Sequence, residues 1–491
     1  MSRLGYLEYL PQGASNISRP EKNPVYWYYG SGAVAFGIKN NAFSYLLLIY
    51  STQVLGIPGY LAATALAIAM AWDAFSDLLL GHWSDKTRSR LGRRHPFMYA
   101  GLIVLPISFY ALFNPPFELT EATAWWYLLA TAILIRTAVT LFEVPSVALL
   151  PDLVKDYDER NQWLALRHTL GWYGGNGIHV INMAAWVGAA GLAVQSGYST
   201  YGSAGAFMIA VSILISSLGT QKPAAAIPPP AETFRVTEMW DEFKQIAQSL
   251  TNSNFFWLFV YSLIVGAAAG MSTALYLYNV TYFFDFSGPQ IAVTGLFVFA
   301  SPAIAYVVAP TLGQRLGKKA AAIAALLGAI FLYPIPYLLT LAGFWPTAGG
   351  WTSLIFYSLF VMTEVVGFIV GGVMLDSMMA DVVEDSEVKT NRRSEGLFYA
   401  ARSFSGKAVS ALGIVLAGSI VSLVGMDGIK SVADMTDAMR ADLATFFLPA
   451  YCGLYFIAIY LISHYRIDRE AHNQNLATLA HKNLHGHQAS D

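Results

Sequence analysis

Two carboxylates lie inside one of the apolar stretches of the chain. Asp73 and Asp77 are four residues apart in the run WDAFSDLLLG, so a helix through this run places both on one face, about one turn apart. Adjacent negative charges repel, and at low dielectric they are tolerated only if they share a proton, meet an Arg or Lys, or coordinate a cation. The pair therefore predicts a site that binds and releases Na⁺ or H⁺. A structural ion pair, or a polar patch facing a water-filled cavity, is the alternative interpretation.

Other ionisable residues also fall within apolar stretches. Each costs at least about 2.5 to 3.5 kcal/mol at the centre of a membrane-spanning helix, so each is a functional hypothesis by default. They are Lys39, Arg136, Glu143, Arg167, Glu364, Asp376, Arg402 and Lys407. For Arg136, Glu364, Asp376 and Arg402 the commoner use is a pair of charges that stabilises helix packing.

The run RHTLGWYGGNGIH gives a weaker signal. Trp172 and Tyr173 are candidates for stacking on a substrate, although aromatic residues near membrane ends more often anchor or pack helices. We expect His168 and His179 to be polar groups that are satisfied within the protein. The glycines of this run favour close approach of a neighbouring helix.

A short basic segment, SDKTRSRLGRRHP, follows the two carboxylates. Its residues Asp85, Arg93 and Arg94 suggest a tight loop in which the arginines bridge neighbouring helix ends and act in gating, although a simple positive anchor on the cytoplasmic side explains the charge as well. A partial repeat of this motif, GQRLGKK, occurs at 313–319. Such a repeat is typical of a duplicated six-helix unit.

Composition indicates what kind of scaffold must position these residues. The 491 residues are 55% hydrophobic and only 12% charged, with a mean hydropathy of +0.47, which is typical of an integral membrane protein. Twelve apolar stretches are long enough to span a bilayer core of about 30 Å. They lie near 25–51, 59–83, 97–114, 123–150, 163–189 and 199–218, then near 253–282, 289–314, 318–342, 350–379, 395–425 and 442–467.

We therefore predict an all-α membrane protein whose twelve transmembrane helices form two six-helix bundles. The predicted segments are a cytoplasmic N-terminal segment (1–24), an N-terminal bundle (25–218), a cytoplasmic connector (219–252), a C-terminal bundle (253–467) and a cytoplasmic tail (468–491). Lys and Arg outside the spans fall overwhelmingly on one side of this topology, which predicts that both termini are cytoplasmic. The first apolar run is long enough to span, so no cleavable signal peptide is expected.

Several classes of protein are disfavoured. The single cysteine, Cys452, rules out a disulfide framework, and the chain has no Walker loop, nucleotide fingerprint or HExxH helix. We therefore expect neither a transporter driven by ATP nor an enzyme. A formal net charge of −2 gives no indication of nucleic acid or of an obligate protein partner. The expected partners are the lipid bilayer and a small-molecule substrate.

Two motifs carry a family resemblance. The basic segment resembles the loop between the second and third helices of the major facilitator superfamily. Together with WDAFSD and with MADVVEDSEVKTNRRSEGLFYAARSFSGK at 379–407, it resembles the glycoside–pentoside–hexuronide:cation symporters, of the melibiose permease type. The resemblance extends over all twelve predicted spans.

The resemblance implies roles for individual residues. It implies cation ligands at Asp73, Ser76, Asp77 and Thr140, an all-oxygen set suited to a hard cation such as Na⁺. It implies substrate contacts at Lys39, Asn40, Glu143, Val147, Arg167 and Lys407. It implies a cytoplasmic gate that includes Arg160, Asp381, Glu384 and Arg393.

The sequence departs from the family where sugars are recognised. Asn40 and Glu143 occupy positions where the family has an aspartate. Val147 and Gly372 occupy positions where a tryptophan is expected, and Leu78 occupies the position of a proline. The resemblance to the family therefore supports coupling to a cation better than it supports specificity for a sugar. We predict a secondary active transporter that couples Na⁺ or H⁺ to uptake of a small solute, a glycoside or related sugar, across the cytoplasmic membrane, with no other cofactor. A lysolipid or other amphipath carrier, and a membrane sensor that does not transport, are the alternatives.

Overall fold

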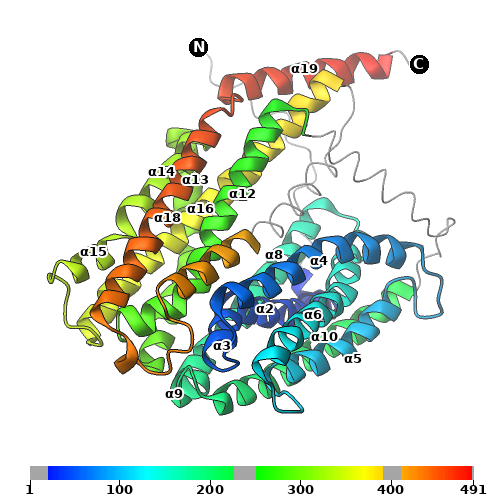
Figure 1. Cartoon of the computed structure of the whole chain (residues 1–491). Helices are drawn as coiled ribbons and strands as arrows, with labels where there is room; N and C mark the ends of the chain where they lie inside the picture. The colour runs from blue at the N-terminus through cyan, green and yellow to red at the C-terminus, as the bar shows by residue number, and fades with distance from the viewer. Residues whose placement is uncertain (1–19, 226–249, 391–410, 489–491) are drawn as a thin grey trace.

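The computed structural model describes residues 20–225, 250–390 and 411–488. Every regular element in these ranges is helical (Figure 1). In the N-terminal half, the helices are α1 (Pro24–Ser31), α2 (Ala33–Asn41), η2 (Ala42–Leu46), α3 (Leu47–Gln53), α4 (Gly59–Lys86), α5 (His95–Phe113), α6 (Glu121–Ala148), α7 (Leu150–Leu153), α8 (Tyr157–Ala185), α9 (Val187–Ala190) and α10 (Gln195–Ala225).

The C-terminal half repeats this sequence of long helices. Its helices are α12 (Ser253–Tyr278), η3 (Asn279–Phe283), α13 (Gly288–Leu316), α14 (Lys318–Leu332), α15 (Ile335–Leu341), α16 (Trp351–Thr390), 411–423, α18 (Asp437–Ser463) and α19 (Arg469–Gln488). Figure 1 shows the two halves as separate groups of helices, with α19 lying across one end of the C-terminal group.

Ten helices of the described ranges are long and apolar enough to cross a membrane. They match ten of the twelve predicted spans to within a few residues, apart from α10, which extends to Ala225, and α16, which extends to Thr390. The span predicted at 163–189 is occupied by α8, whose 29 residues include Arg167, His168 and His179. The span predicted at 395–425 is described only over 411–423. The all-α fold and its membrane-spanning character are therefore confirmed.

One membrane-spanning element in each half contains a π-helical turn. The first spanning element opens into a π-helical turn at Ala42–Leu46, and the corresponding element of the second half does so at Asn279–Phe283. Such turns are rare and occur often at functional sites. The π-helical turn of the first half begins two residues after Asn40, and Asn279, the first residue of the turn in the second half, is fully buried.

Small residues allow the helices that carry the site to approach closely. A Cβ added to Gly37 on α2 would lie 2.1 Å from the backbone oxygen of Gly171 on α8, so only glycine fits there. The expectation that the glycine-rich run at 171–177 permits close helix approach is confirmed. This contact brings α2, with Lys39 and Asn40, against α8, with Arg167.

The two halves meet at the end of the molecule that carries α3 and α9, which we call the sealed end (Figure 1). There the Tyr282 hydroxyl donates to Oε1 of Gln53 at 2.6 Å, and the backbone N–H of Gly59 donates to Asp427 at 2.7 Å. The hydroxyls of Thr52 and Tyr278 lie 2.5 Å apart. Each of these bonds joins the N-terminal half to the C-terminal half.

The other end, which carries residues 85–94 and α19, we call the charged end. The ion pairs between described residues there join residues within one half rather than across the two. Among the described residues, the hydrogen bonds that connect the halves lie at the sealed end.

Candidate functional site

The four predicted cation ligands converge between α4 and α6. Thr140 Oγ1 lies 3.3 Å from Oδ1 of Asp73, 2.9 Å from Oδ1 of Asp77 and 3.4 Å from Oγ of Ser76. Asp73, Ser76 and Thr140 are buried. The helical spacing of Asp73 and Asp77 explains why one hydroxyl on α6 reaches both carboxylates.

The Thr140 hydroxyl faces more acceptors than its single proton can serve. The Thr140 hydroxyl also lies 2.9 Å from the carbonyl oxygen of Arg136, so its single proton faces three acceptors. A small cation is the species that stabilises several converging oxygens at once. The geometry therefore suits Na⁺ or a proton shared between carboxylates.

Arg136 adds a fixed positive charge beside the cluster. Its Nη1 lies 3.3 Å from Oδ2 of Asp73, the carboxylate oxygen that faces away from Thr140, and its guanidinium carbon lies 4.4 Å from the centre of the Phe43 ring. Arg136 balances one of the two carboxylates, which lowers the charge that a bound ion must offset. Sequence reasoning assigned Arg136 no specific partner.

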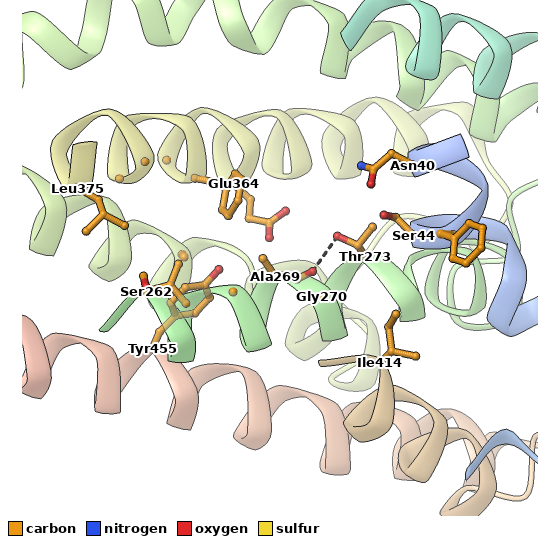
Figure 2. Close-up of a pocket in the computed structure, with 18 of the residues that line it drawn as sticks. Asn40, Ser44, Ser262, Ala269, Gly270, Thr273, Glu364, Leu375, Ile414 and Tyr455 are labelled. Carbon is orange, nitrogen blue, oxygen red and sulfur yellow. Dashed lines mark hydrogen bonds between the residues drawn. The ribbon is translucent and has the colours of Figure 1, made fainter. Parts of the chain in front are cut away.

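A cavity of about 460 Å³ lies between the two halves next to this cluster; we call it the central cavity. Asp73, Arg136, Lys39 and Asn40 line it from the N-terminal half, and Glu364 lines it from α16. The Lys39 side chain is buried, with its Nζ 4.6 Å from the centre of the Phe36 ring. Figure 2 shows Asn40 and Ser44 on one side and Glu364 on the other.

A second cavity, of about 520 Å³, adjoins the central cavity at Phe36, Asn40, Ser44 and Thr273; we call it the side cavity. Glu143, Val147 and Arg167 line it. Arg167 Nη2 lies 2.6 Å from Oε2 of Glu143, and Arg167 Nη1 donates to Oγ of Ser146 at 3.0 Å. The structure thus brings these predicted substrate residues together with Asn40 in adjoining cavities.

The predicted gating residues of the first half form a compact network at the charged end. Arg94 is buried and pairs with Asp85 at 2.9 Å. Arg93 and Arg94 also pair with Asp152 of α7, at 2.7 and 2.5 Å. This network ties the end of α4 and the start of α5 to the end of α6, as the tight-loop hypothesis requires.

The second half repeats the arrangement with other residues. Lys318 Nζ, at the start of α14, lies 2.6 Å from Oδ1 of Asp381 on α16, so the relation of Arg94 to Asp152 recurs. The Tyr465 hydroxyl donates to Oδ2 of Asp381 at 3.2 Å, and burial together with the Asp381 charge raises the pKa of Tyr465. His472 Nδ1 on α19 lies 2.9 Å from Oε2 of Glu384.

Arg160 does not join Asp381 or Glu384 in this structure. Its Nε donates to the backbone oxygen of Val154 at 2.8 Å, within the N-terminal half. Arg393, Arg402 and Lys407 lie outside the described residues. A cross-half gate that includes Arg160, Asp381 and Glu384 stays a hypothesis about a conformation in which the charged ends meet.

Sequence reasoning missed two participants at this end. Asp152 follows directly after the fourth apolar run, in LLPDL, and the sequence analysis did not name it, although the predicted topology places the end of this run on the same side as the basic segment. His472 lies in the segment assigned to the tail, which forms the 20-residue helix α19. Only the fold shows that α19 packs against α16.

Comparisons with known proteins agree with this architecture. A family model described as MFS/sugar transport protein matches residues 28–469. An uncharacterized symporter of Synechocystis sp. is 26% identical over 81% of this chain and 85% of its own. An isoprimeverose transporter of Lactiplantibacillus pentosus is 24% identical over 91% of this chain and 90% of its own. A sodium-dependent lysophosphatidylcholine symporter of Mus musculus is 32% identical, but over 29% of this chain and 27% of its own.

Solved structures show the same fold at low sequence identity. A bacterial homologue of the human lysosomal transporter Spinster, inward-facing and unoccupied, has a TM-score of 0.65 at 12% identity and covers 94% of this chain and 99% of its own. The xylose transporter of E. coli, partially occluded and inward open, has a TM-score of 0.57 at 13% identity, covering 89% and 97%. The fold is that of transporters rather than enzymes, and the chain belongs to the MFS/sugar transport protein family.

Proposed function

We propose that the protein is a symporter that couples the inward flow of Na⁺ or H⁺ to uptake of a small polar solute, a glycoside or related sugar. The observation that carries the proposal is the convergence of Asp73, Asp77, Ser76 and Thr140 beside the central cavity. Four oxygen-bearing side chains of this kind suit a hard monovalent cation. Relatives whose names include an isoprimeverose transporter support the choice of a sugar.

Coupling follows from electrostatics. With no ion bound, the two carboxylates repel each other and compete for Arg136 and Thr140. A bound cation offsets that repulsion and fixes α4 against α6, next to the side chains of Lys39 and Asn40 that face the solute. Ion and solute then raise each other's affinity by the same factor, commonly worth about 1 to 3 kcal/mol.

Access alternates as the two halves move against each other around the central cavity. The excess of Lys and Arg in the loops supports a cytoplasmic position for the charged end and for both termini, in a protein of the cytoplasmic membrane. The bonds of the sealed end then close the outer side. The structure corresponds in this proposal to a state that opens inward.

Uptake into proteoliposomes tests the function directly. The purified protein is reconstituted, and uptake of radiolabelled isoprimeverose, methyl glucosides and methyl galactosides is measured under an inward Na⁺ gradient, an inward H⁺ gradient, or neither. We expect concentrative uptake of at least one sugar under one gradient, and the gradient that drives it identifies the ion. Failure of every sugar to accumulate under both gradients contradicts the proposal.

An amphipath carrier is the second candidate. The central cavity has many apolar lining residues, among them Phe36, Phe43, Leu326, Leu375 and Ile414, and a lysophosphatidylcholine symporter matches part of the chain. This candidate predicts that lysophosphatidylcholine, and none of the sugars, raises the melting temperature in the presence of the coupling ion.

A further inference from the structure

A third cavity, of about 160 Å³, lies between α8 of the N-terminal half and α16 of the C-terminal half; we call it the bridging cavity. It adjoins the central cavity, because Ala269, Thr273, Glu364 and Phe368 line both. A solute in the central cavity therefore has direct access to it. Its lining combines aromatic rings with polar groups from both halves.

The α8 side of this cavity presents two buried nitrogen atoms without partners. Trp172, Asn176 and His179 are spaced by four and three residues, so they form one stripe along the helix. Trp172 Nε1 and His179 Nδ1 are buried and have no hydrogen-bond partner among the described residues. The expectation that His179 is fully satisfied within the protein is therefore wrong for this nitrogen. Buried polar groups are normally paired, so two unpaired ones on side chains that line a cavity indicate a ligand.

The α16 side presents a carboxylate. Glu364 accepts a hydrogen bond from the Tyr451 hydroxyl at 3.1 Å, and the Ser272 hydroxyl is a second neighbour. No Lys or Arg forms an ion pair with Glu364 in the part of the chain that the structure describes. A carboxylate offers about four lone-pair sites, so Glu364 retains capacity for further donors. Figure 2 shows its carboxylate directed into the cavity, toward the side of Thr273 and Asn40.

We propose that Trp172, His179 and Glu364 form a glycosyl subsite that bridges the two halves. A sugar hydroxyl donates one hydrogen bond and accepts others, so neighbouring hydroxyls satisfy both the Glu364 carboxylate and the Trp172 N–H. The rings of Tyr45 and Phe368 cover the apolar face of such a ring. The subsite rests on the proposed function and deepens it, because it supplies recognition that Val147 and Gly372 lack.

A subsite built from both halves ties binding to movement. Trp172 and His179 move with the N-terminal half and Glu364 with the C-terminal half, so a sugar held by all three draws the halves together. A solute that contacts α8 alone does not favour this approach of the two halves. The Glu364 contact is therefore expected to affect transport of sugars and to leave binding of the ion alone unchanged.

Conservative variants test the subsite. Trp172→Phe keeps an aromatic ring and removes the N–H, and Glu364→Gln keeps the size and removes the charge. The matched controls are Trp126→Phe, at an exposed tryptophan on α6, and Thr363→Ala, the exposed neighbour of Glu364 on α16. Initial uptake rates are measured with the panel sugar that wild-type protein transports, and ion binding is measured without sugar. We expect KM to rise roughly ten- to a hundredfold in both test variants and less than about twofold in the controls, with ion affinity unchanged.

Deoxy analogues keep the test decisive where a variant folds poorly. Removing the hydroxyl that contacts Glu364 is expected to raise KM in wild-type protein by the same factor as Glu364→Gln, and to have no further effect in that variant. The proposed function fails if wild-type protein transports no sugar of the panel. The subsite alone is overturned if wild-type protein transports a sugar while both test variants retain its KM, or if no deoxy analogue distinguishes wild type from Glu364→Gln.

Discussion

Asp73 divides its two carboxylate oxygens between unlike neighbours: Oδ2 lies 3.3 Å from Nη1 of Arg136, and Oδ1 lies 3.3 Å from Oγ1 of Thr140. One oxygen thus faces a permanent charge, while the other belongs to the cluster where an ion is expected to bind. Asp77 reaches the same hydroxyl of Thr140 from one turn further along α4. Removing the charge of Asp73 is therefore expected to affect stability as well as ion coupling, whereas removing the charge of Asp77 is expected to affect coupling alone.

Asp77→Asn is expected to abolish ion-driven accumulation and leave the protein folded, because it removes one charge from the cluster without touching the contact between Arg136 and Asp73. Uptake into proteoliposomes and the melting temperature in detergent measure the two effects. Asp442→Asn, an exposed carboxylate on α18, is the control and is expected to transport normally. Full concentrative uptake by Asp77→Asn contradicts the assignment.

Asp73→Asn is expected to lower stability as well as coupling. Arg136 is buried, and removing one partner of a buried ion pair typically costs about 3 to 5 kcal/mol. The double variant Asp73→Asn/Arg136→Gln removes both charges, so it is expected to recover most of the melting temperature and still show no ion-driven uptake. Recovery of uptake in the double variant means that the ion binds elsewhere.

Arg167→Ala is expected to weaken solute binding roughly ten- to a hundredfold, because charged hydrogen bonds contribute about 1.5 to 3 kcal/mol. Ion binding is expected to change much less, since Arg167 lies against Glu143 and Ser146 in the side cavity. Titration calorimetry with each ligand separates the two effects. Arg167→Lys retains the charge but not the planar fork, and is expected to fall between wild type and Arg167→Ala. Equal losses for ion and solute indicate a structural role.

Gly288→Ala is expected to loosen the sealed end. A Cβ at Gly288 on α13 would lie 2.3 Å from the carbonyl carbon of Gly188 on α9, across the contact between the halves. A cysteine at Val280, which is fully buried near this end, reports opening by its rate of alkylation in a Cys452→Ser background. We expect a roughly tenfold faster reaction, equivalent to about 1.4 kcal/mol.

Gly328→Ala is the control for this prediction, because a Cβ there meets nothing within 4 Å. An unchanged alkylation rate in Gly288→Ala means that the close glycine contact does not hold the seal shut.

Asp152→Asn is expected to destabilise the charged end of the N-terminal half. Arg94 is buried and keeps Asp85 as a partner, so the expected loss is about 2 to 4 kcal/mol, somewhat less than for a pair broken outright. Thermal unfolding measures it. Asp156→Asn, at the residue that caps α8, is a nearby acidic control and is expected to leave the stability almost unchanged, because asparagine caps a helix as well as aspartate does. A melting temperature equal to that of wild type removes Asp152 from the network.

The long apolar runs predicted most of the fold, because hydrophobic length alone determines which segments can cross a bilayer. Spacing also predicted that Asp73 and Asp77 share a face, which the structure shows. The partners of these residues were less accessible. Arg136 and Asp73 are 63 residues apart, and only the packing of α4 against α6 brings them together.

The bridging cavity was harder still to predict. Trp172 and His179 carried a signal in their spacing on one helix, but Glu364 lies in the other half of the chain. Nothing local in the sequence relates α8 to α16, and a partner for His179 was the ordinary expectation for a buried imidazole. Unpaired polar atoms become visible only once the surrounding atoms are placed.

The π-helical turns at Ala42–Leu46 and Asn279–Phe283 bear on how a displacement spreads through the molecule. A wide turn weakens the mechanical continuity of a helix, so the part that carries Lys39 can tilt while Gln53 keeps its bond to Tyr282. Each half has such a joint in its first long element. Reorganisation around the solute and opening of the outer seal can therefore occur as successive events instead of one rigid rotation.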